Sequence, residues 1–332
     1  MTQLTLRLED TVPVTAVPAA PLEGLARCDG DGNVYLRFDQ PADPMGAPIV
    51  RISADGEGVK VFSPPPIANL QGAEIDSFSV SPDGSVDLGL WGWDPQAKKG
   101  VGYIATLKDD GSLDHTTKVG AYMEPDQVAG FSSGQTLVSG TRDARIYGKD
   151  QPAVSVPFTE ILDFAGNPAK TLTLPGDFQP AKPGDKDFKA QVYQEPAEIT
   201  LGDAESGSDG NVYLMRHTGK PTVYVISPDG ALLRTLHLAP PSPSASAGFT
   251  IRYGDGGRLA LAFAEFVPGL QKAKVFKDMI ISVYDAQTGE RMVDYLVSPE
   301  LGGDLVCYTS RGFTFLGRTP QHQLAIQRAS AY

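Results

Sequence analysis

Apolar and polar residues alternate along short stretches of this chain, and tight-turn dipeptides separate the stretches. The hexapeptide Asp-Gly-Asn-Val-Tyr-Leu occupies residues 31–36 and recurs at residues 209–214. In each copy the Asp-Gly pair precedes a run with the period of two that half-buried β-strands show. Because Asp-Gly favours tight hairpin turns, the pattern predicts an all-β chain of short antiparallel strands.

The turn signals recur in groups, about 40–60 residues apart, and this spacing is typical of the blades of a β-propeller. Six groups predict a single six-bladed β-propeller domain over residues 1–332. The last blade ends one strand short, and residues 3–9 alternate without a partner nearby, so we expect them to pair with residues 323–328 and complete that blade. The approximate blade bounds are 25–73, 74–122, 123–176, 198–243, 244–303 and 304–332 plus 3–9.

The fourth predicted blade carries the strongest resemblance to a known group of proteins. Its runs Asp209-Gly210-Asn211-Val212-Tyr213-Leu214 and Val223–Leu236 resemble the repeat of six-bladed propellers of the NHL and TolB-like superfamily. The resemblance is good over blades one, two and four and weak over the others. Blade four departs from it between its turns, where Arg216-His217-Thr218-Gly219-Lys220-Pro221 replaces the Asp and the Asn-Arg pair usual in that family. The resemblance implies a fold rather than an activity, because such rings host lyases, hydrolases, sensors and binding platforms.

The turns and the long loops of such a ring are expected on opposite faces. In a four-stranded antiparallel blade, the first and third turns share one face, while the second turn and the link to the next blade share the other. The short Asp-Gly-type turns all fall on the first, or hairpin, face. Loops on a rigid scaffold often carry binding residues, so we expect a central funnel and the binding site on the second, or loop-rich, face. Its long segments are 39–48, 93–100, 142–152, 175–198, 239–248 and 266–278.

Aromatic residues and one histidine make the loop-rich face a candidate ligand-binding surface. Flat amphipathic rings suit sugars, peptides and protein partners alike. The alternative, that these rings form small cores within the loops or pack between blades, stays open. The candidate ligand-binding residues are Trp91, Trp93, Tyr147, Phe188, His217 and Phe266.

Carboxylates recur where the chain enters the innermost strand of a blade. Clustered carboxylate oxygens are the ligands that Ca²⁺ prefers, so these residues are candidates for a calcium site at the mouth of the channel. The alternative is that they are solvated acids on an acidic protein. We expect no other cofactor. The candidate metal ligands, which would also rim the predicted funnel, are Glu74, Glu124, Glu198 and Asp304.

Composition excludes some classes of partner. A net charge of −12 without a basic stripe argues against nucleic acid. No apolar run reaches the ~18 residues of a membrane span. The first six residues have neither a basic start nor an apolar run, so the compartment stays open: exported (periplasmic or extracellular) if a leader has been removed, and cytoplasmic otherwise.

Cys28 and Cys307 are the only cysteines in the sequence. Both fall on predicted innermost strands of the two blades that meet where the ring closes. Innermost strands diverge around a channel, whereas a disulfide needs Cα atoms within ~7 Å. We therefore expect two buried thiols.

No coherent set of catalytic residues emerges. Residues 130–134, Gly-Phe-Ser-Ser-Gly, match the nucleophile pattern Gly-x-Ser-x-Gly, but they lead into a hairpin turn rather than from a strand into a helix. The first hypothesis is therefore a non-enzymatic platform that binds a protein, peptide or glycan on the loop-rich face. One alternative is a calcium-dependent hydrolase or lyase with a carboxylate-lined channel mouth. Another is a structural subunit of a larger assembly.

Overall fold

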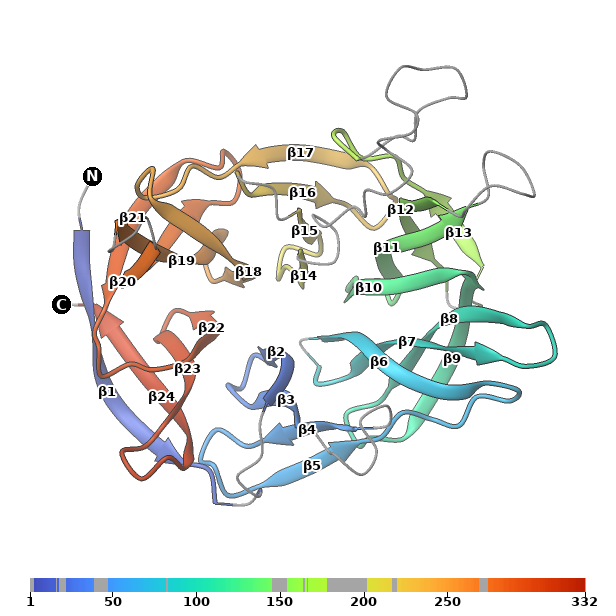
Figure 1. Cartoon of the computed structure of the whole chain (residues 1–332), viewed down its shortest axis with the longest axis horizontal. Coiled ribbons are helices and arrows are strands. Elements are labelled where there is room, and N and C mark those ends of the chain that lie inside the picture. Colours follow the sequence, from blue (N-terminus) through green and yellow to red (C-terminus); the bar gives the residue numbers. More distant parts are fainter. Residues whose placement is uncertain are drawn as a thin grey trace.

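The computed structural model describes residues 3–15, 17, 22–38, 47–81, 83–144, 154–163, 165, 167–177, 202–216, 220–268 and 274–331. These residues form β-strands and turns, and no helix occurs among them. Four sheets have four strands each, and a fifth sheet has eight. The sheets surround a common axis in a propeller-like arrangement, as the alternating pattern predicts (Figure 1).

Each four-stranded sheet is an antiparallel meander whose strands follow chain order from the axis outward. The first contains β2 (Leu22–Cys28), β3 (Val34–Phe38), β4 (Ile49–Ile52) and β5 (Val59–Phe62). The second contains β6 (Gln71–Val80), β7 (Val86–Asp94), β8 (Lys99–Leu107) and β9 (Leu113–Ala121). The third contains β10 (Met123–Gly130), β11 (Thr136–Ala144), β12 (Val154–Leu162) and β13 (Pro168–Thr171). The fourth contains β14 (Asp203–Ser206), β15 (Val212–Arg216), β16 (Thr222–Ile226) and β17 (Leu232–His237).

The eight-stranded sheet has the order β18-β19-β20-β21-β1-β24-β23-β22. Its first half contains β18 (Ala245–Gly254), β19 (Arg258–Pro268), β20 (Lys274–Asp285) and β21 (Arg291–Val297). Its second half contains β1 (Gln3–Pro13), β22 (Asp304–Thr309), β23 (Gly312–Arg318) and β24 (Leu324–Ala331).

The N-terminal strand β1 closes the ring by pairing with the C-terminal strand. It runs antiparallel to β24, with Leu6 opposite Ala331 and Pro13 opposite Ala325. The expected pairing between the two ends of the chain is confirmed, but residues 6–8 face 329–331, and it is residues 10–13 that face 325–328. On its other edge β1 pairs in parallel with β21. This second pairing merges strands that the sequence assigns to two blades into one curled sheet.

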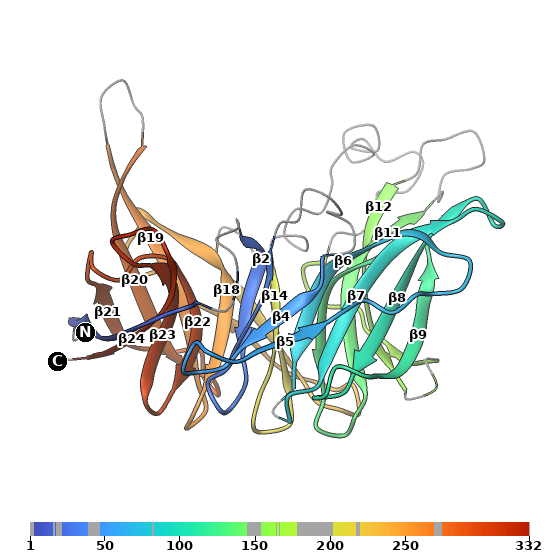
Figure 2. The ribbon, with the colours of Figure 1, turned by 90° about the horizontal axis from the view of Figure 1, so that it is seen from below.

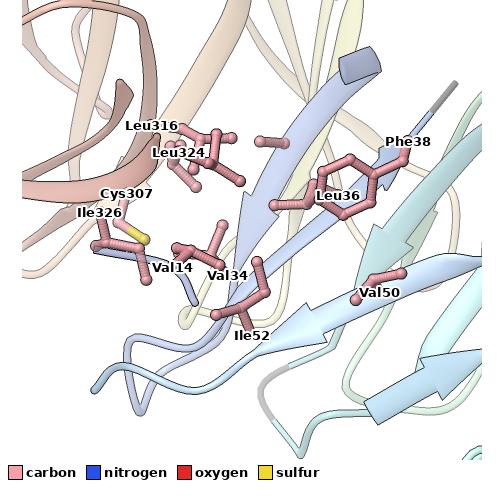
Figure 3. Packing of buried hydrophobic residues seen from close by; sticks show 12 residues of the cluster. Val14, Val34, Leu36, Phe38, Val50, Ile52, Cys307, Leu316, Leu324 and Ile326 are labelled. Carbon is pink, nitrogen blue, oxygen red and sulfur yellow. The ribbon is translucent and has the colours of Figure 1, made fainter. Parts of the chain in front are cut away.

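Buried apolar side chains gather in six clusters within the described part of the chain. Four of them join successive sheets, from the first sheet to the β18–β21 half of the eight-stranded sheet, and one joins the two halves of the eight-stranded sheet. The sixth packs Val34 and Ile52 of the first sheet against Leu316 and Ile326 of the eight-stranded sheet (Figure 3). The core therefore lies between sheets, all the way around the ring.

The repeated hexapeptide ties a buried tyrosine to its turn in both copies. Tyr35 and Tyr213 are fully buried, and each is part of a cluster between sheets. The Tyr35 hydroxyl donates to Asp29 at 3.0 Å, and the Tyr213 hydroxyl donates to Asp209 at 2.9 Å. The two tyrosines share their burial, but their acceptors do not correspond: Asp209 opens its hexapeptide, whereas Asp29 precedes the other copy by two residues.

The tight turns after the innermost strands lie on one face, and the long β19–β20 hairpin rises from the other (Figure 2). The Gly32 amide donates to the Asp29 carbonyl, and the Gly210 amide donates to the Gly207 carbonyl, which closes two of these turns. Both glycines have a φ of 83°, a region that favours glycine. Among the described residues there is no helix that could span a membrane.

Cys28 and Cys307 form a disulfide, so the expectation of two thiols is wrong. Their placement on innermost strands is as predicted, at the end of β2 and within β22. Their Cα atoms lie 5.7 Å apart, within the range that a disulfide spans. At this position the two inner strands approach each other, and a register shift in β22 between Leu305 and Cys307 accompanies the approach.

Candidate functional site

Three of the four candidate metal ligands lie on innermost strands. Glu74 is near the start of β6, Glu124 is near the start of β10, and Asp304 begins β22. Glu74 and Glu124 are half-buried, whereas Asp304 is exposed, and β22 lies across the axis from β10 (Figure 1). Glu198 lies outside the described residues. The fold therefore groups Glu74 with Glu124 and not with Asp304.

Two aspartates complete an acid cluster, which we define as Glu74, Asp76, Glu124 and Asp126. In both strands the second acid sits in a β-bulge: the pairing shifts between Ile75 and Ser77 in β6, and between Glu124 and Gln127 in β10. Bulges re-aim side chains out of the regular alternation. The Oδ2 atoms of Asp76 and Asp126 are enclosed, and neither has a hydrogen-bond partner among the described residues.

Burial and mutual repulsion hold the two aspartates close to neutrality. Burial raises the pKa of Asp76 to about 8, and the charges of Glu124, Glu74 and Asp126 add to the rise. Burial also raises the pKa of Asp126 to about 7, again with a contribution from Glu124. Arg37 opposes the shift at Asp76 and donates to the Ile75 carbonyl beside it. At neutral pH the cluster therefore holds protons as well as negative charge.

The aromatic candidates divide into packed and exposed rings. Trp91 lies opposite Gly102 in β8 and covers Gly100, where a Cβ would overlap its ring. Trp93, on the same side of β7, is 48% exposed. Phe266 packs edge-on against Phe276 at 6.2 Å between ring centroids. The remaining three, Tyr147, Phe188 and His217, lie outside the described residues.

Phe276 belongs to the predicted long segment 266–278 but not to the list of candidate ligand-binding residues, and it is 58% exposed. It lies near the end of the β19–β20 hairpin, where Val267 and Val275 are also exposed. A sequence signal does point to Phe276. Along the β19–β20 hairpin the exposed side chains are charged as far as the ion pair of Glu265 with Lys277, at 2.9 Å, and are apolar beyond it.

The axis itself holds a buried ion-pair network that the sequence did not indicate. Asp203 of β14, with no exposed surface, accepts from Arg27 of β2 and, at 3.1 Å, from Arg252 of β18. Glu205 accepts from Arg27 at 3.2 Å. Burial raises the pKa of Glu205, and Arg252 and Arg27 oppose the shift. The network neutralises its own charges.

Backbone carbonyls extend this network to further sheets. Arg27 donates to the Phe78 carbonyl of β6 at 3.3 Å. Arg252 donates to the Val306 carbonyl of β22 and to the Ala26 carbonyl of β2, both at 2.6 Å. Five inner strands thus meet through two guanidinium groups. The arrangement fits a structural tie, because each charged group is already occupied by protein.

A third buried arginine joins the third and fourth sheets. Arg216 of β15 donates to Ser139 at 2.9 Å and to Gln127 and Thr159 at 3.2 Å each. Burial lowers the pKa of Arg216, and its ion pair with Asp177 at 3.3 Å opposes the shift.

No group of three or more His, Cys, Asp or Glu side chains in the described ranges is arranged to hold a metal ion. The calcium hypothesis, which includes Glu198, stays a prediction.

A cavity of about 170 Å³ lies at the hairpin end of the channel. Its floor contains Arg27, Glu205 and Arg252, and its rim contains residues of the tight turns. It opens on the face opposite to the funnel that the sequence predicts. The described residues do not test that funnel, because its predicted rim includes Glu198, which lies outside them.

No protein-family model matches the chain, and no curated protein matches it significantly. Solved structures do match. One is a protein of unknown function from Dyadobacter fermentans DSM 18053, at 12% identity over 98% of this chain and 99% of that one, with a TM-score of 0.52. Another is a protein of unknown function from Bacteroides caccae, at 12% identity over 82% of this chain and 85% of that one, with a TM-score of 0.45. At this identity the first likeness shows a shared fold and carries no activity.

Proposed function

We propose that this protein is a non-enzymatic platform that binds a protein, peptide or glycan on its loop-rich face. The observation that supports the proposal most is the exposure of Trp93 at 48% and Phe276 at 58% on two hairpins of that face. Large aromatic rings contribute strongly to binding when a partner covers them. The mutual pairing of the axial arginines and carboxylates supports a structural use of those charges rather than a catalytic one.

We also propose that the ring has six blades, as in the NHL and TolB-like superfamily. The strand order of the eight-stranded sheet supports a division at the β1–β21 pair into two blades of four strands. The six core clusters, one for each junction between successive blades, support the same count. An experimental structure in which β18 to β24 share one undivided sheet without β1 between the halves would contradict it.

The binding proposal is tested with a glycan array and a peptide display library. We expect at least one ligand class to bind, and Trp93→Ala or Phe276→Ala to weaken that binding about tenfold or more, as hot-spot aromatics do. Leu113→Ala is the matched control, because Leu113 is 46% exposed but begins β9, next to a turn of the hairpin face. No binding to either collection, or equal loss in the control, would count against the proposal.

A calcium-dependent hydrolase or lyase is the competing hypothesis. It draws support from the unpartnered Oδ2 atoms of Asp76 and Asp126 beside Glu74 and Glu124. Metal analysis of protein purified without chelators separates the two proposals. A melting temperature that rises with Ca²⁺, and no longer rises when Glu74→Gln and Glu124→Gln are combined, would favour the metal enzyme. An unchanged melting temperature and metal-free protein would remove it.

A further inference from the structure

The cavity at the hairpin end of the channel is large enough for one small ring. Its volume of about 170 Å³ is comparable to engineered cavities of roughly 150 Å³ that bind benzene. Its walls come from the ends of five innermost strands and the turns that follow them.

The charges at the floor of this cavity are already compensated. Arg27 is paired with Asp203 and Glu205, and Arg252 is paired with Asp203. An anion entering the cavity would compete with these carboxylates for the guanidinium groups. The acids that line the cavity, Asp29, Glu205 and Asp255, already accept hydrogen bonds from the protein. The floor therefore favours an uncharged ligand.

One wall offers a buried hydroxyl without a protein partner. Ser79 is only 4% exposed, and its Oγ makes no hydrogen bond within the described part of the chain. Buried hydroxyls are normally satisfied, so an unpaired one suggests a missing partner. Ser81, Ser208 and Thr309 place further hydroxyls around the cavity, and the rings of Tyr253 and Tyr308 add flat apolar surface. This combination suits a ring compound with several hydroxyl groups.

We propose that this cavity is a second binding site, for a small uncharged polyhydroxylated ring such as a single sugar unit. The site is separate from the loop-rich face and does not depend on the binding function proposed there. The Ser79 side chain turns about χ1 so that its enclosed hydroxyl hydrogen-bonds the ligand, and the tyrosine rings contact the faces of the ligand.

Isothermal titration calorimetry with D-glucose, inorganic phosphate and ethanolamine tests the class of ligand. We expect D-glucose to bind and the two charged probes to give no heat of binding. Absence of binding by D-glucose, or binding of phosphate or ethanolamine in its place, would overturn the proposal.

Two variants test the location. Gly30 lines the cavity, and a Cβ added there meets no atom within 4 Å, so Gly30→Tyr fills the mouth without a backbone clash. We expect it to abolish D-glucose binding. Gly302→Tyr is the matched control, because Gly302 has the same free space and does not line the cavity. D-glucose binding that survives Gly30→Tyr, or that Gly302→Tyr or Trp93→Ala removes, would contradict the assignment.

Ser79→Ala decides the outcome if Gly30→Tyr fails to fold. The variant removes a hydroxyl that makes no protein hydrogen bond, so folding should be preserved. We expect binding of D-glucose to weaken about fivefold to tenfold, as for the loss of one hydrogen bond. An unchanged affinity would contradict the role of Ser79 in the site.

Discussion

Replacing Asp203 with Asn tests whether the axial network holds the ring together. The side chain has no exposed surface, and its carboxylate accepts from Arg27, from Arg252 at 3.1 Å and from the Ile251 amide at 2.9 Å. The amide of Asn keeps the shape but removes the charge, and it turns a donor toward an arginine. Two buried guanidinium groups then share one remaining acidic partner, Glu205.

The expected cost follows from the burial of the network. Breaking a buried ion pair by removing one partner costs about 3–5 kcal/mol. The unfolding entropy of a 332-residue chain is roughly 0.7 kcal/mol per kelvin, at about 2.1 cal/mol/K per residue. A loss of about 4 kcal/mol should therefore lower the melting temperature by about 6 °C.

Urea unfolding followed by the fluorescence of Trp91 and Trp93 measures the cost. Asp10→Asn is the matched control, because Asp10 pairs with Arg328 at 2.8 Å while 54% of its side chain is exposed. A surface pair of this kind contributes less than about 1 kcal/mol. If Asp203→Asn cost no more than Asp10→Asn, the network would not be the tie that its burial and contacts indicate.

Three further predictions follow from the acid cluster, the disulfide and the closing strand. Because the folded pKa of Asp76 is about 8 and its ordinary value is 3.8, its contribution to stability is lost as the pH rises through 8. Between pH 5 and 9 the free energy of unfolding of the wild type should fall by a few kcal/mol relative to that of Asp76→Asn, at about 1.4 kcal/mol per pH unit between the two pKa values. If chemical denaturation gave the same dependence of unfolding free energy on pH for both proteins, this prediction would be wrong. Asp110→Asn is the control, because Ser112 lowers the pKa of Asp110 and keeps its titration below this range. The disulfide spans a sequence separation of 279, so Cys28→Ala with Cys307→Ala should cost about 3–5 kcal/mol in unfolding experiments. Mass spectrometry of the unreduced protein should show two hydrogens fewer than the dithiol form, and a mass equal to that form would refute the bond. Deleting residues 3–13 leaves the edges of β24 and β21 unpaired, so light scattering should show self-association, and a monodisperse monomer would argue against the closure.

Local signals made most of the fold predictable. The Asp-Gly turns at residues 31–32 and 209–210 mark hairpins because the turn conformation depends on the residues within it. The pairing of β1 with β24 followed from counting strands, because the last predicted blade lacked one strand and residues 3–9 had no partner nearby. The parallel pairing of β1 with β21 did not, because it depends on how closely two outer edges approach in space.

The candidate site was predictable only in part, for a similar reason. Glu74 and Glu124 share a position relative to the following turn, and the structure does bring their strands together at the acid cluster. The axial network was missed because Arg27, Asp203 and Arg252 come from three different inner strands, and the sequence does not show which charges meet at the axis. The disulfide was missed because the distance between inner strands is a tertiary quantity that no local pattern encodes.

The position of β1 has a consequence during protein synthesis. Asp10 reaches its partner Arg328 across 318 residues of sequence. At about 5–20 residues per second, a ribosome needs roughly 15–60 s to make that length. For most of this interval β1 has neither of its neighbours, because β21 and β24 are made near its end, and β1 presents two open edges to other chains. Chaperone protection of the newly made β1 should therefore matter more for the yield of this protein than the stability of the finished ring.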